Sequence, residues 1–211
     1  MILRYFDECH YIPASILDIG CNKGQFYELC KKKWGAKPKI VLIDGNTSLK
    51  ETLDKLDVKY HLSLLSDKKR SATFYLTKRS KTGSGASLYR EDTYVYDDDL
   101  VIKESRSTTT LDDLFKEDNK FDIIKLDTQG SELDIMRGGL SLCKKADYII
   151  LEVSLIEYNK GAPLKEEACE FMRSIGFSAV KTIGLKRPKR GKFKGKKIQE
   201  DIIFKNARSI L

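Results

Sequence analysis

The segment Asp18-x-Gly20-x-x-x-Gly24 has the residue types of a cofactor-binding turn. Glycines between a strand and a helix let backbone amides come close to a ligand, which is why nucleotide cofactors bind at such turns. Here Cys21 and Asn22 stand where a dinucleotide-binding turn has the second glycine that makes room for a pyrophosphate. The turn therefore disfavours NAD and FAD.

A second acid lies at the spacing expected for a ribose contact. Asp44 follows Gly24 by 20 residues (44 − 24), at the end of the next predicted strand, where a carboxylate can accept both ribose hydroxyl protons. S-adenosylmethionine has a ribose, a sulfonium and an amino acid tail, so carboxylates near the turn suit it better than a phosphate cradle. We predict this cofactor, with Asp18 facing its ammonium group directly or through water. The alternative is that the glycines only shape a tight turn and Asp44 caps the next helix.

Two further acids, Asp127 and Glu152, end the predicted strands 121–126 and 148–153. Ligands of open parallel sheets bind beyond the carboxyl ends of the strands where the strand order reverses. We therefore predict Asp127 as general base or orienting group, with Glu152 as second choice, and expect their proximity to raise one of the two pKa values. The alternatives are that Asp127 caps the helix after it, and that Glu152 pairs with Lys125 or is exposed.

The elements that must position these residues alternate between apolar runs and helical patterns, which indicates βαβ units on a mostly parallel sheet. Without a tandem repeat or a linker, residues 1–211 are predicted to form a single Rossmann-like α/β domain. Residues 77–99 are predicted to form a long loop over the site. The predicted strands are 15–19, 39–43, 58–65, a short 72–76, 121–126, 148–153, 177–184 and 198–204, and the predicted helices are 23–34, a stretch ending near 56, 111–115, 131 to about 138, and 163–175.

The chain resembles the FkbM-type methyltransferases over nearly its whole length. The resemblance rests on Ile16-Leu17-Asp18-Ile19-Gly20-Cys21-Asn22-Lys23-Gly24, on Thr110-Leu111-Asp112-Asp113-Leu114 and above all on Ile124-Lys125-Leu126-Asp127-Thr128-Gln129-Gly130-Ser131-Glu132-Leu133. It implies a class I methyltransferase fold, with helices on both faces of a seven-stranded, mostly parallel sheet whose last strand is antiparallel. It also implies O-methylation, often of sugar hydroxyls. The chain departs from the family pattern in two places. The stretch before the first strand is short, so that the elements that often cover the site look short or missing, and residues 186–197 form a basic insertion.

The resemblance also implies several contact residues. Ser66 and Asp67 stand where the family's adenine contacts usually arise. Ser87 and Tyr89 lie in a stretch that resembles a small-residue motif of the family over the active site; the alternative is that they belong to a disordered loop tip. By their position alone, in the turn and first helical residues after Asp127, Gln129 and Glu132 are further substrate-contact candidates. A helix start also attracts such residues without any ligand.

The net charge of +8 comes from one segment. Residues 186–197 hold eight basic residues and no acid, so the remainder balances at 39 − 8 = 31 basic against 31 acidic residues. The segment lies in the predicted 185–197 connection between the last two strands, where we expect a flexible arm beside the site. We predict that Lys192 and Lys194 help to recruit an anionic acceptor, which would be a phosphorylated or nucleotide-linked sugar, an acidic glycan or nucleic acid. The alternative is a solvated hairpin loop.

The composition argues against membrane-spanning, secreted, metal-binding and disulfide-rich proteins. No apolar run is long enough to span a bilayer and no signal peptide is recognisable, so we expect a soluble, cytoplasmic protein. Five scattered cysteines and two histidines favour neither a metal site nor disulfides. We predict an S-adenosylmethionine-dependent O-methyltransferase acting on a hydroxyl of a sugar, glycan or related small acceptor. The alternatives are an RNA or cap ribose 2′-O-methyltransferase and a non-catalytic nucleic-acid-binding module with a Rossmann core.

Overall fold

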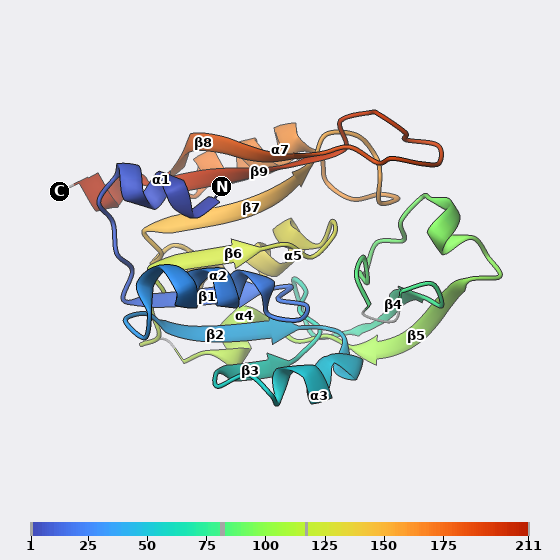
Figure 1. Cartoon of the computed structure of the whole chain (residues 1–211), viewed down its shortest axis with the longest axis horizontal. Coiled ribbons are helices and arrows are strands. Elements are labelled where there is room, and N and C mark those ends of the chain that lie inside the picture. The colour runs from blue at the N-terminus through green and yellow to red at the C-terminus, as the bar shows by residue number, and fades with distance from the viewer. Residues whose placement is uncertain (1, 81–82, 117, 211) are drawn as a thin grey trace.

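The computed structural model describes residues 2–80, 83–116 and 118–210. Its main sheet has seven strands in the order β3-β2-β1-β6-β7-β9-β8, as Figure 1 shows. All of them are parallel except β9, which runs antiparallel to both β7 and β8. The predicted sheet with an antiparallel last strand is therefore confirmed. The strands are β1 (Ser15–Ile19), β2 (Lys39–Asp44), β3 (Lys59–Leu62), β6 (Ile123–Leu126), β7 (Tyr148–Ser154), β8 (Phe177–Lys186) and β9 (Gln199–Asn206).

Helices cover both faces of the sheet (Figure 1). One face buries side chains of α1 and α2, and the other buries side chains of α4 to α7. Strands β6 and β7 are buried along their whole length, as expected for central strands with helices on both sides. The helices are α1 (Ile2–Glu8), α2 (Gln25–Trp34), α3 (Lys50–Leu53), α4 (Leu111–Leu114), α5 (Glu132–Arg137), α6 (Leu140–Cys143) and α7 (Lys165–Ser174), with 3₁₀ turns η1 (Thr47–Leu49), η2 (Tyr94–Tyr96) and η3 (Ala207–Ile210).

Helix α1 was not predicted. Its Phe6 is buried and packs edge-on against Trp34 and Tyr148. Just after the helix, the Tyr11 hydroxyl donates to Asp147 Oδ2 at 2.7 Å. The segment before β1 is thus a packed element of the fold, stabilised by tertiary contacts and not by a helical pattern of its own.

A second, two-stranded sheet flanks the predicted loop of residues 77–99. Strand β4 (Ser71–Thr77) pairs antiparallel with β5 (Val101–Ser107), which was not predicted. In Figure 1 this pair and its connection extend beyond the carboxyl ends of the parallel strands. Residues 78–100, of which 81–82 lie outside the described residues, link the two strands; we call this segment the β4–β5 loop.

Within the described residues the longest helices, α2 and α7, have 10 residues each. No helix there combines the length and the hydrophobicity needed to cross a bilayer.

Candidate active site

A cavity of about 420 Å³ opens at the carboxyl ends of β1, β2 and β6. This is the edge where the strand order reverses between β1 and β6, as predicted for the site. The predicted site residues that line it are Asp18, Gly20, Cys21, Asn22, Asp44, Ser87, Asp127 and Gln129. Those that do not line it are Gly24, Ser66, Asp67, Tyr89, Glu132, Glu152, Lys192 and Lys194.

The turn between β1 and α2 packs closely against β2 on one side and the residue after β6 on the other. Gly20 has φ 78°, and a Cβ there would lie 1.9 Å from the backbone oxygen of Asp127. The backbone N–H groups of Gly20 and Cys21 both donate to the Ile43 oxygen, at 2.9 and 3.1 Å. Packing alone therefore requires a glycine at this position. Gly20, Cys21 and Asn22 of this turn also line the cavity. The turn can therefore be shaped by packing and bind a ligand as well.

The Asp44 carboxylate is fixed by two backbone N–H groups. Its Oδ2 accepts from Asn22 and its Oδ1 accepts from Asn46, each at 2.8 Å. Burial raises the pKa of Asp44 above its ordinary value, although these two N–H groups oppose the rise. Asn46, and not Asp44, caps the 3₁₀ turn η1 that follows. Each carboxylate oxygen keeps a further lone pair for a ligand hydroxyl.

Asp18 is completely buried, and among the described residues neither of its oxygens has a hydrogen-bond partner. Its nearest cation is Lys125, whose Nζ lies 3.8 Å from Asp18 Oδ1 and 3.2 Å from Asp127 Oδ2. Burial raises the pKa of Asp18 to about 6, with Lys125 opposing the rise. Burial alone would lower the pKa of Lys125, but the charges of Asp127 and Asp18 raise it. Lys125 is thus a buried cation shared by two carboxylates.

Gln129 joins the two predicted catalytic acids. Its side-chain nitrogen donates to Asp127 Oδ1 at 3.0 Å and to Glu152 Oε2 at 2.5 Å. Glu152 also accepts from Gln199 at 2.9 Å and forms an ion pair with Lys186 through Oε1. The result is a continuous polar network from β6 through β7 to the ends of β8 and β9.

The pKa values of the two carboxylates of this network are shifted in opposite directions. Burial would raise the pKa of Asp127, but Lys125 and Lys186 hold it well below its usual range. Burial, followed by the charge of Asp127, raises the pKa of Glu152 well above its usual range, and Lys186 only partly offsets this. The partner of Glu152 is Lys186, and not the Lys125 that the sequence alternative named.

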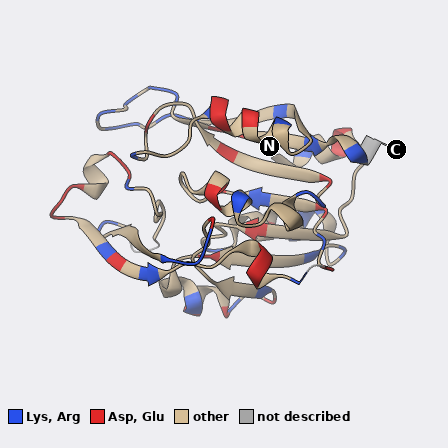
Figure 2. Cartoon of the chain, turned by 180° about the vertical axis from the view of Figure 1, so that it is seen from behind, with Lys and Arg blue, Asp and Glu red and all other residues tan. Residues whose placement is uncertain are grey.

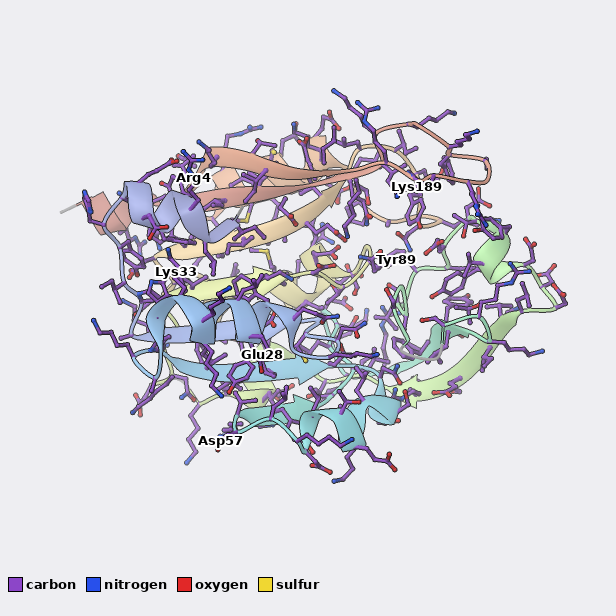
Figure 3. The ribbon with its side chains drawn as sticks, viewed as in Figure 1. Arg4, Glu28, Lys33, Asp57, Tyr89 and Lys189 are labelled. Carbon is purple, nitrogen blue, oxygen red and sulfur yellow. The ribbon has the colours of Figure 1, made fainter. Side chains whose placement is uncertain are left out.

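Two predicted substrate contacts lie away from the cavity. The buried Glu132 carboxylate accepts the backbone N–H groups of Thr128 and Gly130, at 2.7 and 2.9 Å, so it supports the turn after β6 from within. The Tyr89 hydroxyl, whose residue is labelled in Figure 3, donates to Asp134 Oδ2 at 2.7 Å. Ser87 does line the cavity, and its hydroxyl donates to the Gln129 backbone oxygen at 2.9 Å.

The predicted adenine contacts, Ser66 and Asp67, are also displaced from the cavity. Leu65 already bridges to Thr109, and the chain then turns toward Gly138, where a Cβ would lie 2.2 Å from the Ser66 backbone oxygen. The Ser66 hydroxyl donates to Asp67 at 3.0 Å. The residues of this segment that do line the cavity come just before, and with Phe74 they form a largely apolar wall: Ser63, Leu64 and Leu65.

The basic segment is anchored, contrary to the expectation of a flexible arm. We call residues 186–197 the basic strap. Its Phe193 is buried, with its ring centroid 5.6 Å from that of Tyr158, and Lys192 forms an ion pair with Asp92 of the β4–β5 loop. Lys192 and Lys194 do not line the cavity described above. Figure 2 shows the strap as a mainly blue segment near the red-tipped loop.

A second cavity of about 530 Å³ lies between the basic strap and the β4–β5 loop. It adjoins the first, because Ser84, Gly85, Gln129 and Lys186 line both. The sequence interpretation missed three residues of this region as site residues. Lys186 was counted only as one charge of the strap, Gln199 only as part of the family pattern, and Glu91 was not singled out.

The comparisons with known proteins agree with this geometry. The family model of the methyltransferase FkbM domain matches residues 18–179. None of the curated proteins compared with the chain matches it. Similar solved structures include PH1948 of Pyrococcus horikoshii, proposed to be an RNA methyltransferase (12% identity, TM-score 0.53, covering 100% of this chain and 82% of that one).

Two other similar structures are named as methyltransferases. Magnesium protoporphyrin IX methyltransferase ChlM from Synechocystis PCC 6803, with bound SAM, has 10% identity and a TM-score of 0.55, over 98% of this chain and 76% of that one. A methyltransferase from Clostridium acetobutylicum ATCC 824, named as S-adenosylmethionine-dependent, has 11% identity and a TM-score of 0.55, over 97% and 89%. At such low sequence identity, the structural similarity to these proteins shows a shared fold alone. Because the family model covers well over half of the chain, the chain belongs to the FkbM family of S-adenosylmethionine-dependent methyltransferases.

Proposed function

We propose that this methyltransferase transfers the methyl group of S-adenosylmethionine to a hydroxyl of a small acceptor, a sugar or glycan. The observation that carries the proposal is the position of Asp127. Its carboxylate lies in the cavity wall beside the cofactor turn, and its partner Gln129 lines both cavities. A hydroxyl reaching in from the second cavity would meet this carboxylate.

The first cavity has the chemistry that the cofactor requires. The Asp18 carboxylate, whose oxygens accept no hydrogen bond from the described residues, suits an ammonium group, and the two oxygens of Asp44 suit ribose hydroxyls. The wall of Leu64, Leu65 and Phe74 suits an adenine ring. When bound, the cofactor supplies an electrophilic methyl group on a sulfonium.

The chain itself has to orient the acceptor oxygen and take its proton. Asp127 is ionised at neutral pH, because Lys125 and Lys186 lower its pKa, and it can accept a hydrogen bond from the hydroxyl. The oxygen becomes strongly acidic only as its new C–O bond forms, so a carboxylate of low pKa can take the proton and release it to solvent. Holding the oxygen in line contributes up to about 7–11 kcal/mol of the barrier reduction.

A methyl-transfer assay with an acceptor panel tests the proposal. S-adenosylmethionine labelled on the methyl group is incubated with neutral sugars, nucleotide sugars, oligosaccharides and RNA, and the methylated atom is located by mass spectrometry and NMR. The expected product is an O-methyl sugar. A methyl group only on a base nitrogen or carbon would overturn the proposal.

Ribose 2′-O-methylation of RNA is the second candidate, and the eight basic residues of the strap favour it. The acceptor chemistry is the same, because a ribose hydroxyl would meet Asp127 in the same way. The facing loop argues against it, since its exposed Asp97 and Asp99 would repel a phosphate backbone.

A further inference from the structure

We propose that the second cavity binds a phosphate group of the acceptor, with the Arg187 guanidinium as its principal partner. The inference deepens the proposed hydroxyl methylation and rests on it, because it names the class of acceptor as a phosphorylated sugar or a nucleotide-linked one. It is carried by the cavity, by the charges at its wall and by the contacts that fix the strap.

The second cavity continues from the part of the first cavity that contains Asp127, where the acceptor hydroxyl would lie. Both are lined by Gln129 and Lys186, and Gln129 also donates to Asp127 in the first cavity. Lys186 lies in the same network through its ion pair with Glu152. A molecule with its hydroxyl at Asp127 therefore extends past these two side chains into the second cavity.

Arg187 is a cation with spare capacity at that cavity. One of its nitrogens donates to the Gly195 backbone oxygen at 2.7 Å, which holds the guanidinium in place. Within the described ranges, no Asp or Glu lies within ion-pair distance of Arg187, unlike Lys186 and Lys192 of the same strap. A guanidinium has five N–H donors in a planar fork that matches a phosphate in bidentate geometry. Most of its donors are thus open to a ligand.

The strap holds Arg187 in position before any ligand binds. The Gly195 N–H donates to the Pro188 oxygen at 2.9 Å, which closes the strap on itself. Phe193 packs on Tyr158, and Lys192 pairs with Asp92. Because the strap is already ordered, binding would cost less conformational entropy than ordering a free arm.

The wall opposite the strap favours a small, hydroxylated ligand over a polyanion. Glu91 of the β4–β5 loop lines the same cavity and is largely buried, and its carboxyl group can accept hydrogen bonds from sugar hydroxyls. Burial raises the pKa of Glu91 above its ordinary value. Acids elsewhere on that loop would repel a longer nucleic acid. A sugar with a single phosphate could place its phosphate at Arg187 and its hydroxyls at Glu91.

Calorimetric titration of the whole protein, saturated with S-adenosylhomocysteine, tests the site. The probes are inorganic phosphate, glucose 6-phosphate and glucose, and the variants are Arg187→Gln and its matched control Arg190→Gln. Arg190 is an exposed cation of the same strap that lines neither cavity. We expect Arg187→Gln to weaken phosphate and glucose 6-phosphate binding by about tenfold or more and Arg190→Gln by less than about twofold, with glucose weaker throughout. S-adenosylhomocysteine binding should stay unchanged in both, which confirms that they are folded.

Three outcomes would overturn the inference: no phosphate binding to the natural protein at millimolar concentration, equal losses in the two variants, or single-stranded RNA displacing phosphate with a steep salt dependence to which both arginines contribute equally. The last outcome would make the strap a polyanion surface. Failure of the proposed function is distinguishable, because it would leave phosphate binding dependent on Arg187 while no hydroxyl on any acceptor is methylated.

Discussion

The carboxylate of Asp44 accepts the backbone N–H of Asn22 at 2.8 Å, which ties the end of β2 to the turn after β1. The acid expected to hold the ribose and the turn expected to hold the rest of the cofactor therefore form one hydrogen-bonded unit. A change in the carboxylate should affect both its ligand contacts and the turn beside it.

Asp44→Asn should weaken cofactor binding. An asparagine can accept only one of the two backbone N–H groups through its oxygen, and its NH₂ would face the other donor. We expect the affinity for S-adenosylhomocysteine, measured by calorimetry, to fall about 10–100-fold, or roughly 1.4–2.7 kcal/mol. Asp54→Asn, at an exposed ion pair with Lys50, is the control and should bind normally. An affinity of Asp44→Asn within twofold of the natural protein would contradict the assignment.

Gly20→Ala should destabilise the fold itself. The new methyl group would collide with the Asp127 backbone oxygen in a backbone region that side chains rarely adopt. We expect a loss of more than about 3 kcal/mol in the free energy of unfolding from urea denaturation. Gly176→Ala is the control, since it also has a positive φ but no atom within 4 Å of its Cβ, and it should cost about 1–2 kcal/mol. Equal losses would show that the close approach to Asp127 contributes nothing.

The central sheet was predictable because burial leaves a strong pattern. Strands β1, β6 and β7 are short apolar runs bounded by turn residues, and their order places Asp18 and Asp127 at one edge. Strand β5 leaves no such pattern. Its residues are mostly exposed and polar, and its pairing with β4 is all that defines it. Helix α1 is too short for a periodic signal and depends on the packing of Phe6.

The residues of the candidate site could be predicted from the sequence where they directly follow a strand of the expected sheet. They could not be predicted where the pairing of distant strands brings them to the site. Lys186 reaches Glu152 from the end of β8, whose register against β9 shifts between Ile183 and Lys186. Ser66 was expected at the cavity but does not line it, because the path of the chain after β3 depends on a long-range bridge between Leu65 and Thr109. Such pairings have no local sequence signal.

Asp18 should make stability fall as the pH rises from about 4 to about 6. Its pKa is about 6 in the folded protein and near 3.8 when unfolded, so in this window the folded state binds more protons than the unfolded state. The cost of burying the charge is absent below pH 4 and complete above pH 6. Relative to Asp18→Asn, the natural protein should lose roughly 3 kcal/mol of unfolding free energy between pH 4 and pH 7.

Denaturation series of both proteins across that range measure this difference. The other raised acids, such as Glu152 and Asp44, are present in both proteins and cancel. A constant difference between the two proteins at all pH values would show that Asp18 titrates as an ordinary acid.

Asp127→Asn should separate chemistry from binding. The substitution keeps the shape of the side chain and a partner for Gln129 but removes the charge that would orient the hydroxyl and take its proton. Once an acceptor is identified, kcat should fall about 10²–10⁴-fold, a range typical of a lost general base. Lys125 keeps Asp18 as an ion-pair partner in this variant. The melting temperature and the affinity for S-adenosylhomocysteine should therefore stay close to those of the natural protein. Glu200→Gln, in an ion pair with Lys165 that lines neither cavity, should leave kcat unchanged. If Asp127→Asn keeps its kcat, the carboxylate serves only to neutralise Lys125, and the hydroxyl must meet a different group.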